Sequence, residues 1–297
     1  MIKIGGDVRI AEPMAGRTSF RIGGPADLFV SPATAEEAGR ALALCVRESI
    51  PCFLLGGGTN ILVSDRGIRG VVIDLSRLSG MTADGTLVIA LGGTPVSSVA
   101  EFALARGLTG LEFAFALPGS VGGAVWMNAR CYEGEVSAVL EYVDYLGPDL
   151  VERRHAMDPA EWDYKHSPFQ AMSATIHRAG FRLAPGDPVR IRRLMDDHRR
   201  DRESKGHFLY PCAGSVFKNN RLFGAPTGRL VDSLGLKGRR IGGAQVAPFH
   251  GNIIINTGGA TSGDVRALIE LMEEEVRRSL GFRLEREVLL VGDWSPP

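Results

Sequence analysis

The residue best suited to chemistry is a serine in the last third of the chain, within the string YPCAGSVFKNN at residues 210–220. The Ser215 hydroxyl could serve as a nucleophile, a proton donor, a phosphate ligand or a turn cap. A hydrolase nucleophile sits on a sharp G-x-S-x-G elbow, and the string AGSVF at residues 213–217 lacks the second glycine. Lys218 and Asn219 follow closely and offer a charge and amide donors to a ligand. The string argues against a nucleophile and leaves the other roles open.

Two acidic residues near the C-terminus form a second candidate. In the string LEREVLLVG at residues 284–292, Glu285 and Glu287 are two positions apart on a predicted strand, so we expect them to share one face. Two carboxylates at short range repel each other, and one of them would then hold its proton unusually well. The alternative is a solvated sheet edge, on which both carboxylates face Arg283 and Arg286.

Two glycine clusters indicate a phosphate-bearing ligand. The string LLGGGTN at 54–60 follows a hydrophobic strand, and its successive backbone N–H groups suit an anionic phosphate. It is neither a Walker loop nor a G-x-G-x-x-G motif, and a tight turn with nothing bound is the alternative. The string LPGSVGGAVWMNA at 117–129 repeats the pattern, and two such clusters favour a dinucleotide-type cofactor. The candidate cofactor contacts are Gly56, Gly57, Gly58, Thr59, Asn60, Pro118, Gly119, Ser120, Gly122, Gly123 and Asn128.

A polar string in the middle of the chain, DYKHSPFQ at 163–170, gathers tyrosine, lysine, histidine and serine around a turn. His166 could act as a general base, but the sequence shows no partner for it. The alternative is a polar surface loop capped by Pro168.

Composition limits the class of protein. The 297 residues, 44% of them hydrophobic, can build a substantial core in two or three lobes. The 34 basic and 34 acidic residues cancel, which argues against nucleic acid as a partner. The N-terminal string MIKIGGDVRI contains no long apolar run, so we expect no signal peptide, and no stretch is long enough for a membrane span. The four cysteines fit no C-x-x-C pattern and the six histidines no metal spacing. We expect reduced thiols in a cytoplasmic protein, and no metal.

Hydrophobic periodicity predicts a mixture of helices and strands that must position these residues. The expected helices lie at 31–50, 94–107, 187–205, 228–238 and 261–281. The expected strands lie within 52–65, 70–76, 87–93, 136–147, 174–184, 252–256 and 284–292. Strands and helices do not alternate regularly, so the expected class is α+β.

Several expected helix ends carry known signals. Thr34 and Glu37 are spaced as a capping box at the start of the first helix. Thr94 would cap the second helix, with Pro95 at its first position. The last helix carries an apolar stripe and would stop at Gly281.

The strings occur in an order that resembles one enzyme family. After TSFRIGGPAD at 18–27 come GGGTN, PGSVGGAVWMNA, YKHSPF, AGSVFKN, GGAQV and LEREV. Any one of them is modest evidence, but the ordered set is specific and covers nearly the whole chain. The sequence resembles the UDP-N-acetylenolpyruvoylglucosamine reductases, the flavoenzymes that make UDP-N-acetylmuramate for peptidoglycan, and its length is similar to the shorter (type II) branch.

The resemblance implies a fold. Two N-terminal lobes, 1–75 and 76–198, would form an FAD-binding module of the vanillyl-alcohol-oxidase type. A C-terminal α+β domain, 199–297, would bind the substrate. FAD would be the cofactor, NADPH the co-substrate and a UDP-sugar the substrate. We expect a monomer.

The resemblance also implies residue roles. Hydride would pass from flavin N5 to the vinyl carbon C3 of the substrate, and an enolate would develop at C2. Ser215 matches the family's proton donor to C2, and Glu287 matches the glutamate that assists there. Tyr132 and Asn219 match substrate contacts, and Lys218 lies beside them.

One departure from the family pattern concerns the cation near the enolate. Lys165 stands where the family commonly has arginine, so the charge is kept but the bidentate fork is lost. Arg130 stands where the family usually has a small residue. We therefore hypothesise that Arg130 supplies part of the missing guanidinium function.

Two other functions remain open from the sequence. The first is an FAD-dependent oxidoreductase of the same fold acting on another small substrate. The second is a sugar-nucleotide or flavin binding protein without turnover. The basic residues Arg199, Arg200, Arg202 and Lys205 could meet the UDP phosphates, or they form a solvated helix end.

Overall fold

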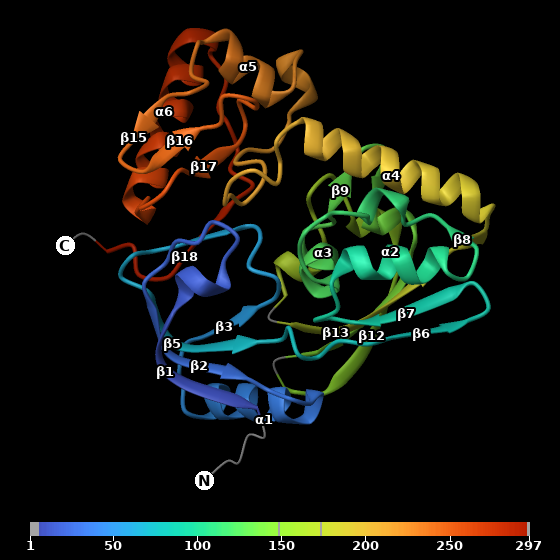
Figure 1. Ribbon diagram of the computed structural model, residues 1–297. Helices are drawn as coiled ribbons and strands as arrows, with labels where there is room; N and C mark the ends of the chain where they lie inside the picture. The colour runs from blue at the N-terminus through green and yellow to red at the C-terminus, as the bar shows by residue number, and fades with distance from the viewer. Residues whose placement is uncertain (1–5, 148, 173, 296–297) are drawn as a thin grey trace. The chain divides into compact units, whose positions relative to one another are not determined.

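The computed structural model describes residues 6–147, 149–172 and 174–295 (Figure 1). The expectation that no signal peptide is present rests partly on residues 1–5, which lie outside the described residues. By their contacts the residues divide into two compact units. Unit 1 comprises the chain up to Ile10, Leu28–Gly57 and Gly70–Asp201. Unit 2 comprises Ala11–Asp27, Gly58–Arg69 and the chain from Arg202 onward.

A four-stranded sheet forms the first layer of unit 1, with the strand order β1-β2-β5-β3. Its strands are β1 (Asp7–Pro13), β2 (Pro25–Ser31), β3 (Cys52–Leu55) and β5 (Ile68–Asp74). Helix α1 (Ala35–Arg47) lies along this sheet (Figure 1). Ala41 and Cys45 of α1 are buried with Val30, Val71 and Ile73 of the strands. The apolar helix face predicted from the sequence thus packs on the strand that leads into the first glycine cluster.

A second sheet of unit 1 has five antiparallel strands in the order β12-β11-β13-β7-β6. They are β6 (Met81–Asp84), β7 (Leu87–Leu91), β11 (Leu140–Leu146), β12 (Glu152–Ala156) and β13 (Thr175–Arg182). Helices α2 (Val96–Leu104) and α3 (Val121–Trp126) lie on one face of this sheet (Figure 1). Val99, Val125, Val143 and Phe181 are fully buried between helices and sheet. This core fixes α3, whose first turn carries the second glycine cluster.

Helix α4 (Pro188–Ser204) runs from unit 1 into unit 2, with Ile191 and Met195 buried. The remaining short strands of unit 1 pair as β8 (Leu108–Thr109) with β14 (Ala184–Pro185) and β9 (Arg130–Cys131) with β10 (Gly134–Glu135). Short 3-10 helices lie at Met14–Arg17, Glu112–Ala114, Val136–Ala138, Pro159–Glu161, Pro168–Gln170 and Arg221–Phe223.

Unit 2 packs helix α6 (Ser262–Leu280) against an antiparallel three-stranded sheet. The sheet contains β15 (Arg240–Ile241), β16 (Ala244–Val246) and β17 (Ile254–Asn256), and α5 (Thr227–Ser233) also contacts α6. The predicted stripe of α6 is completely buried, and it consists of Val265, Leu268, Ile269, Met272 and Val276. Beside them, β4 (Ile61–Val63) runs parallel to β18 (Leu289–Val291), so the unit joins distant parts of the chain.

The compact units differ from the expected lobes 1–75, 76–198 and 199–297. Residues 11–27 and 58–69, expected in the first lobe, pack with the C-terminal third of the chain. The pairing of β4 with β18 explains this, because a parallel ladder ties residue 61 to residue 289. The expected start of the last domain lies close to the unit boundary after Asp201.

The helix ends follow the sequence signals in part. Thr34 caps α1 by accepting a hydrogen bond from the Glu37 N–H at 3.2 Å. The Glu37 carboxylate, however, accepts from the N–H of Ala33 at 2.8 Å, one residue before the cap. Gly281 ends α6 with a φ of +75°, as predicted.

The expected cap of the second helix is wrong. The N-cap of α2 is Pro95 and the first helical residue is Val96. The Thr94 hydroxyl is used elsewhere, because it accepts from the Gly80 N–H at 3.0 Å and donates to the Gly80 carbonyl at 3.1 Å. In the part of the chain that the structure describes, we find no helix both long and apolar enough to cross a bilayer.

Candidate active site

The two glycine clusters touch in unit 1 so closely that side chains would not fit between them. A Cβ placed on Gly57 would lie 2.7 Å from the Gly119 Cα, and one on Gly56 would lie 2.4 Å from the Ser120 Oγ. The Ser120 hydroxyl caps α3 by accepting from the Gly123 N–H at 3.3 Å. Both strings are therefore glycine-rich because their backbones must approach each other. We call residues 56–57 and 119–120 the paired loops.

The paired loops leave backbone donors available. Among the hydrogen bonds of residues 6–147, 149–172 and 174–295, none uses the N–H of Gly57, Gly119 or Ser120 as donor. The next two N–H groups, of Val121 and Gly122, donate to backbone carbonyls at 2.8 and 2.7 Å. Adjoining N–H groups without protein acceptors form an anion-binding surface. The paired loops thus fit the pyrophosphate of FAD.

A substitution at Gly57 tests this arrangement. In Gly57→Ala the new methyl group meets the Gly119 backbone at 2.7 Å, so the loops must separate. We expect the Kd for FAD to rise at least about tenfold, with a loss of about 1–3 kcal/mol in the free energy of unfolding. Flavin fluorescence titration of the apoprotein and thermal unfolding measure the two effects.

The matched control is Gly39→Ala in the middle of α1. Its nearest neighbour would be the Leu146 Cδ1 at 3.9 Å, and alanine is the better helix former by about 1 kcal/mol. This variant should keep its FAD affinity and gain stability. Equal FAD affinity in both variants would contradict the role of the paired loops.

The rest of the first glycine cluster belongs to unit 2 and packs there. Gly58 has a φ of +61°, and a Cβ on it would lie 2.1 Å from the Arg17 carbonyl oxygen. The Asn60 Nδ2 donates to the Glu287 carbonyl oxygen at 3.0 Å. Asn60, predicted as a cofactor contact, thus holds the backbone of the predicted catalytic glutamate. Direct contacts of Gly58, Thr59 and Asn60 with the cofactor stay a prediction.

Asn128, also predicted at the cofactor, is 1% exposed and uses both ends of its amide inside unit 1. Its Nδ2 donates to the Asp163 carbonyl oxygen and its Oδ1 accepts from the Ser137 N–H, each at 3.0 Å. Its φ is +44°, a left-handed conformation that asparagine tolerates. Asn128 therefore positions the DYKHSPFQ loop, and its contact with the cofactor stays a prediction.

Two residues that the sequence analysis did not assign hold the same loop. The Ser167 hydroxyl, fully buried, donates to the Trp126 carbonyl oxygen at 2.7 Å. The Gln170 Nε2 donates to the carbonyl oxygens of Trp126 and Lys165, each at 3.0 Å. His166, the candidate base, is exposed. The loop therefore fixes the backbone at Lys165 rather than presenting a histidine.

One cationic candidate of unit 1 lies near the residue that precedes the other in the chain. The Arg130 guanidinium carbon is 5.9 Å from the centre of the Tyr164 ring, and Tyr164 directly precedes Lys165. The Arg130 Nη1 is 3.6 Å from the Glu135 Oε2, and about one third of each side chain is exposed. This geometry is compatible with two cations serving one anionic group.

Tyr132, a predicted substrate contact, is anchored to α4. Its hydroxyl donates to the His198 carbonyl oxygen at 2.6 Å and lies 3.2 Å from the Asp201 Oδ2. Its ring stacks on the His198 ring with the centres 3.9 Å apart. Any substrate contact of Tyr132, which stays a prediction, would use the remaining ring face or edge.

Ser215 lies in a short segment of unit 2, residues 215–218, that is held from both sides. On one side Ser215 pairs with Ile253 in an antiparallel bridge. The Val216 N–H donates to the Asn252 carbonyl oxygen at 2.9 Å. The Asn252 side chain bonds the backbone of Phe217 twice, at 3.0 Å to the N–H and at 2.8 Å to the carbonyl oxygen. The serine is therefore part of a ladder and not of a strained elbow.

On its other side the segment meets the LEREV string. The N–H groups of Glu287 and Val288 both donate to the Val216 carbonyl oxygen, at 2.8 and 3.3 Å. Two residues opposite one define a β-bulge, a distortion that redirects side chains and is frequent next to active sites. Glu287 is 8% exposed on this bulge. A hydroxyl and a buried carboxylate thus come from adjoining segments.

Glu285 and Glu287 do not share an environment, contrary to the expectation of one common face. Glu285 is 70% exposed and forms an ion pair with the Lys218 Nζ at 2.7 Å. The bulge interrupts the period-two alternation before β18 begins, which is the physical reason for the difference. The solvated alternative describes Glu285 but not Glu287, which is buried, and Arg286 faces Glu273 at 2.5 Å instead of either residue.

Asn219, a predicted substrate contact, is exposed at the end of the same segment. Its Oδ1 accepts from the Thr227 N–H at 2.9 Å, at the first residue of α5. Its role toward the substrate stays a prediction.

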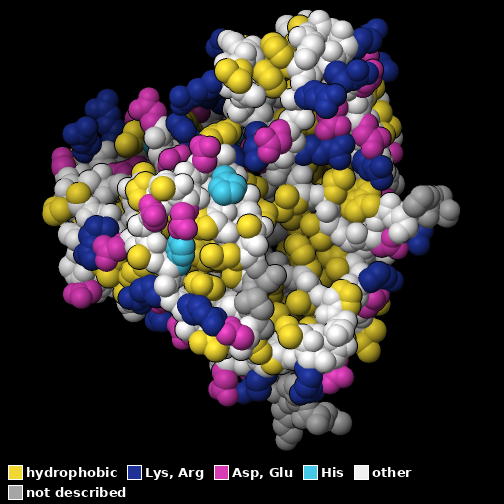
Figure 2. Space-filling view, turned by 180° about the vertical axis from the view of Figure 1, so that it is seen from behind, with side chains coloured by type: hydrophobic (Ala, Val, Ile, Leu, Met, Phe, Trp, Pro, Cys, Tyr) yellow, Lys and Arg dark blue, Asp and Glu magenta, His cyan; other side chains and the backbone are white. Residues whose placement is uncertain are grey.

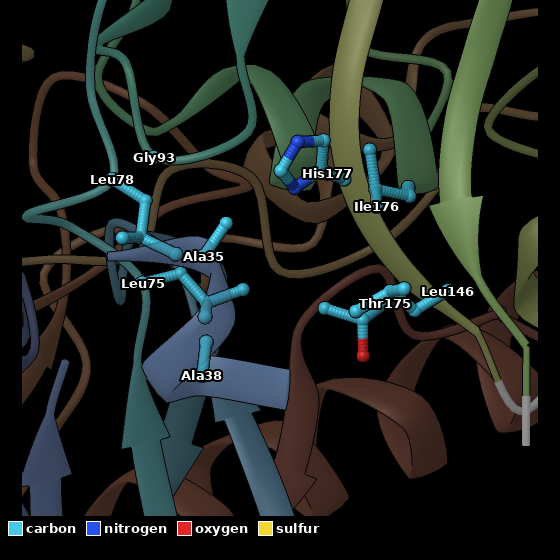
Figure 3. Close-up of a pocket in the computed structure, with 9 residues that line it drawn as sticks. All are labelled: Ala35, Ala38, Leu75, Leu78, Gly93, Leu146, Thr175, Ile176 and His177. Carbon is cyan, nitrogen blue, oxygen red and sulfur yellow. The ribbon is translucent and has the colours of Figure 1, made fainter. Parts of the chain in front are cut away.

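Unit 1 contains a small cavity (Figure 3). Its volume of about 10 Å³ holds no more than one water molecule. It is lined by Ala35, Ala38, Leu75, Leu78, Gly93, Leu146, Thr175, Ile176 and His177. A ligand the size of a nucleotide cannot enter it.

Charged side chains of both signs are interspersed on the face seen in Figure 2. Arg199 and Arg200 are exposed near the end of α4, and Arg200 pairs with Asp197 at 2.5 Å. Contact of this basic cluster with UDP phosphates stays a prediction.

Two protein-family models match the parts of the chain that carry these residues. An FAD-binding-domain model matches residues 26–149, which include the paired loops. A second model, described as UDP-N-acetylenolpyruvoylglucosamine reductase, C-terminal domain, matches residues 206–291, which carry Ser215 and Glu287. The fold and these matches define an FAD-dependent oxidoreductase. A Treponema denticola protein named UDP-N-acetylenolpyruvoylglucosamine reductase is 42% identical over 98% of this chain and 95% of its own. The chain belongs to the UDP-N-acetylenolpyruvoylglucosamine reductase family, which uses FAD and NADPH.

Other relatives agree. A Clostridium botulinum (strain Hall) protein of the same name is 40% identical over 97% of this chain and 93% of its own. The crystal structure of UDP-N-acetylenolpyruvylglucosamine reductase from Thermus caldophilus superposes with a TM-score of 0.81 at 30% identity, covering 97% of this chain and all of that one. The predicted family, α+β fold with an FAD-binding module, enzyme class and cofactors are confirmed.

Proposed function

We propose that this protein reduces the enolpyruvyl group of UDP-N-acetylglucosamine enolpyruvate to give UDP-N-acetylmuramate for peptidoglycan synthesis, with NADPH as the reductant. The observation that carries the proposal is the ladder of unit 2, in which the Ser215 segment lies against the bulge that bears Glu287. A hydroxyl donor and a buried carboxylate on adjoining segments suit proton delivery to carbon. The name shared by the relatives supports the same UDP-sugar substrate.

FAD, when bound, supplies the hydride that adds to the vinyl carbon C3 of the substrate. The residues of this chain that would hold it include the paired loops, with the open N–H groups of Gly57, Gly119 and Ser120 toward its pyrophosphate. The remaining task of the protein is to manage the negative charge and the proton at C2.

Ser215 would deliver this proton. An alcohol is a weak acid, but an enolate is a strong enough base to take its proton when the two are well placed. The C–H bond at C2 forms as the O–H bond of Ser215 breaks, and the serine then recovers a proton from solvent. Glu287 assists from the adjoining bulge. No covalent bond between enzyme and substrate is needed.

Lys165 and Arg130 would stabilise the developing enolate. Fixed positive charge beside an enolate lowers the barrier because the interaction is stronger in the transition state than in the ground state. Lys165 acts as a point charge, and Arg130 can bind a carboxylate in bidentate fashion. The position of the Arg130 guanidinium, 5.9 Å from the ring of Tyr164, supports this division of roles, because Tyr164 directly precedes Lys165.

Single and double variants separate the two cations. We expect Lys165→Ala to lower kcat about 10–100-fold. This is less than we would expect if Lys165 were the single cation at the enolate, because Arg130 still supplies positive charge. Lys165→Arg should retain most activity. Arg130→Ala should raise the KM for the enolpyruvyl substrate about tenfold, whereas Arg153→Ala, at an exposed pair with Asp149, should change neither constant. If Lys165→Ala with Arg130→Ala is no slower than Lys165→Ala alone, Arg130 takes no part.

Turnover with defined substrates tests the function itself. NADPH oxidation by the purified yellow protein should depend on UDP-N-acetylglucosamine enolpyruvate. Bound FAD with turnover on another small substrate would instead favour a different oxidoreductase of this fold. Bound FAD with no turnover on either substrate would favour a binding protein.

The proposed chemistry also indicates where the protein acts. Both the nucleotide-sugar substrate and NADPH are intracellular metabolites, so we propose a cytoplasmic enzyme. The monomeric state stays a prediction that size-exclusion chromatography with light scattering would check.

A further inference from the structure

We propose that Asn252 is a positioning residue for the proton donor. Its side-chain amide substitutes for a neighbouring strand and fixes the segment that carries Ser215. This inference rests on the proposed function, in which Ser215 gives a proton to the substrate.

The contacts of Asn252 reach two successive residues of this segment. Its carbonyl oxygen accepts from the Val216 N–H at 2.9 Å. Its side chain accepts from the Phe217 N–H at 3.0 Å and donates to the Phe217 carbonyl oxygen at 2.8 Å. Asn252 is 2% exposed, so water does not compete strongly for these bonds. The next residue, Ile253, forms the bridge with Ser215.

The turn before Ile253 explains why a side chain is needed. Ser215 pairs with Ile253 and the Val216 N–H donates to the Asn252 carbonyl oxygen, but the backbone before Asn252 does not continue alongside Phe217. Residue 251 instead belongs to a turn, in which the Ala247 N–H donates to the Ile253 carbonyl oxygen at 2.8 Å and the Ile253 N–H donates to the His250 carbonyl oxygen at 3.1 Å. The Asn252 amide provides the donor and the acceptor that the turned backbone cannot.

The same turn also holds Asn252. The Asn252 N–H donates to the His250 Nδ1 at 3.1 Å, which requires that this ring nitrogen is unprotonated. Burial, and secondarily the nearby Lys205, lower the pKa of His250, so its ring is neutral at physiological pH and can accept this bond. The chain of contacts therefore runs from the turn through Asn252 to the segment of the proton donor.

The role of such a residue lies in distance control. Proton transfer from a serine requires that its oxygen reach the acceptor carbon within a narrow range, and a displacement of about 1 Å can cost roughly 100-fold in rate. Without the amide, Phe217 loses both bonds on this side, and only the Ser215–Ile253 bridge and the bond of the Val216 N–H still hold the segment there. Ser215 would keep its chemistry but lose its position.

The test compares Asn252→Ala with Asn256→Ala. Asn256 is also buried in unit 2 and uses its side chain similarly, donating to the Phe20 carbonyl oxygen at 3.0 Å and accepting from the Gly258 N–H at 2.9 Å. We expect comparable falls in Tm. Only Asn252→Ala should slow reoxidation of the reduced enzyme by the enolpyruvyl substrate, about 100-fold, with reduction by NADPH unchanged.

Two readouts do not depend on turnover alone. Hydrogen exchange of the Val216 and Phe217 amides should accelerate at least about tenfold in Asn252→Ala and stay unchanged in Asn256→Ala. The solvent deuterium isotope effect on reoxidation should increase, because the proton transfer becomes more rate-limiting. If Asn252→Ala does not fold, Asn252→Asp replaces it, since it keeps the acceptor for the Phe217 N–H and should show an intermediate loss.

The possible outcomes distinguish this inference from the proposed function. Equal slowing of both half-reactions in Asn252→Ala and Asn256→Ala, or unchanged exchange at Phe217, overturns the positioning role. A normal reoxidation rate in Asn252→Ala, together with a blocked one in Ser215→Ala, overturns it as well but leaves the proposed function intact. A normal rate in Ser215→Ala overturns the proton-donor role of Ser215, and failure of the enolpyruvyl substrate to reoxidise the unaltered enzyme overturns the proposed function itself.

Discussion

Replacing Ser215 by alanine is expected to block reoxidation of the reduced enzyme by the enolpyruvyl substrate while leaving reduction by NADPH nearly intact. In the proposed function the hydroxyl supplies the proton to C2, and loss of a general acid costs about 10²–10⁴-fold in rate. Hydride addition without protonation leaves an enolate that returns its electrons, so the product does not accumulate. Stopped-flow absorbance of the flavin measures both half-reactions separately.

Two further serine variants sharpen this test. Ser233→Ala removes a hydroxyl of the same unit that donates only to the Leu230 carbonyl oxygen at 2.8 Å, and it should leave both half-reactions unchanged. Ser215→Cys restores a more acidic proton in a similar place and should recover part of the rate. Equal loss of both half-reactions in Ser215→Ala would show a general structural role instead of proton donation.

Replacing Glu287 by glutamine should produce the second-largest effect, a fall of about 10²–10³-fold in reoxidation. Glutamine keeps the size of the side chain and the β-bulge that sets it, because both bulge bonds use backbone N–H groups. Only the buried carboxylate is lost. Single-turnover kinetics with substrate measure the loss, and thermal unfolding verifies the fold.

Glu285→Gln is a matched control two residues away. Glu285 is 70% exposed and pairs with Lys218, and such surface pairs contribute at most about 1 kcal/mol. This variant should stay within about twofold of the unaltered rate. If the two variants behave alike, the carboxylate of Glu287 has no special part in catalysis.

The elements that depend on local pattern were predictable from the sequence. The stripe of α6 is an example, because its five apolar positions repeat with the helical period and all five are buried. The glycine stop at Gly281 is another, since a left-handed residue after a helix is a local requirement. Ser215 and the paired loops also stand out by type and order.

The distant contacts could not be predicted. The bulge at Glu287 depends on which residue of a segment some 70 positions earlier lies opposite Glu287. A shift of this pairing by one residue would leave the amino-acid sequence unchanged, so the sequence cannot show it. The bond from Asn60 to Glu287 spans 227 positions. Asn128 was recognised as a polar residue in the right string, but a sequence does not show that its amide is already satisfied by protein groups.

The interleaved composition of unit 2 has a consequence for how the protein is made. Strand β4 at residues 61–63 leaves the ribosome early, while its partner β18 at residues 289–291 is among the last parts synthesised. The Asp65 carboxylate likewise accepts a hydrogen bond from the Ser262 N–H, a residue synthesised 197 positions later. The nascent chain therefore carries an unpaired apolar strand edge through most of translation, a state prone to aggregation. Loss of the final strand would consequently disturb residues near the start of the chain as much as those near its end.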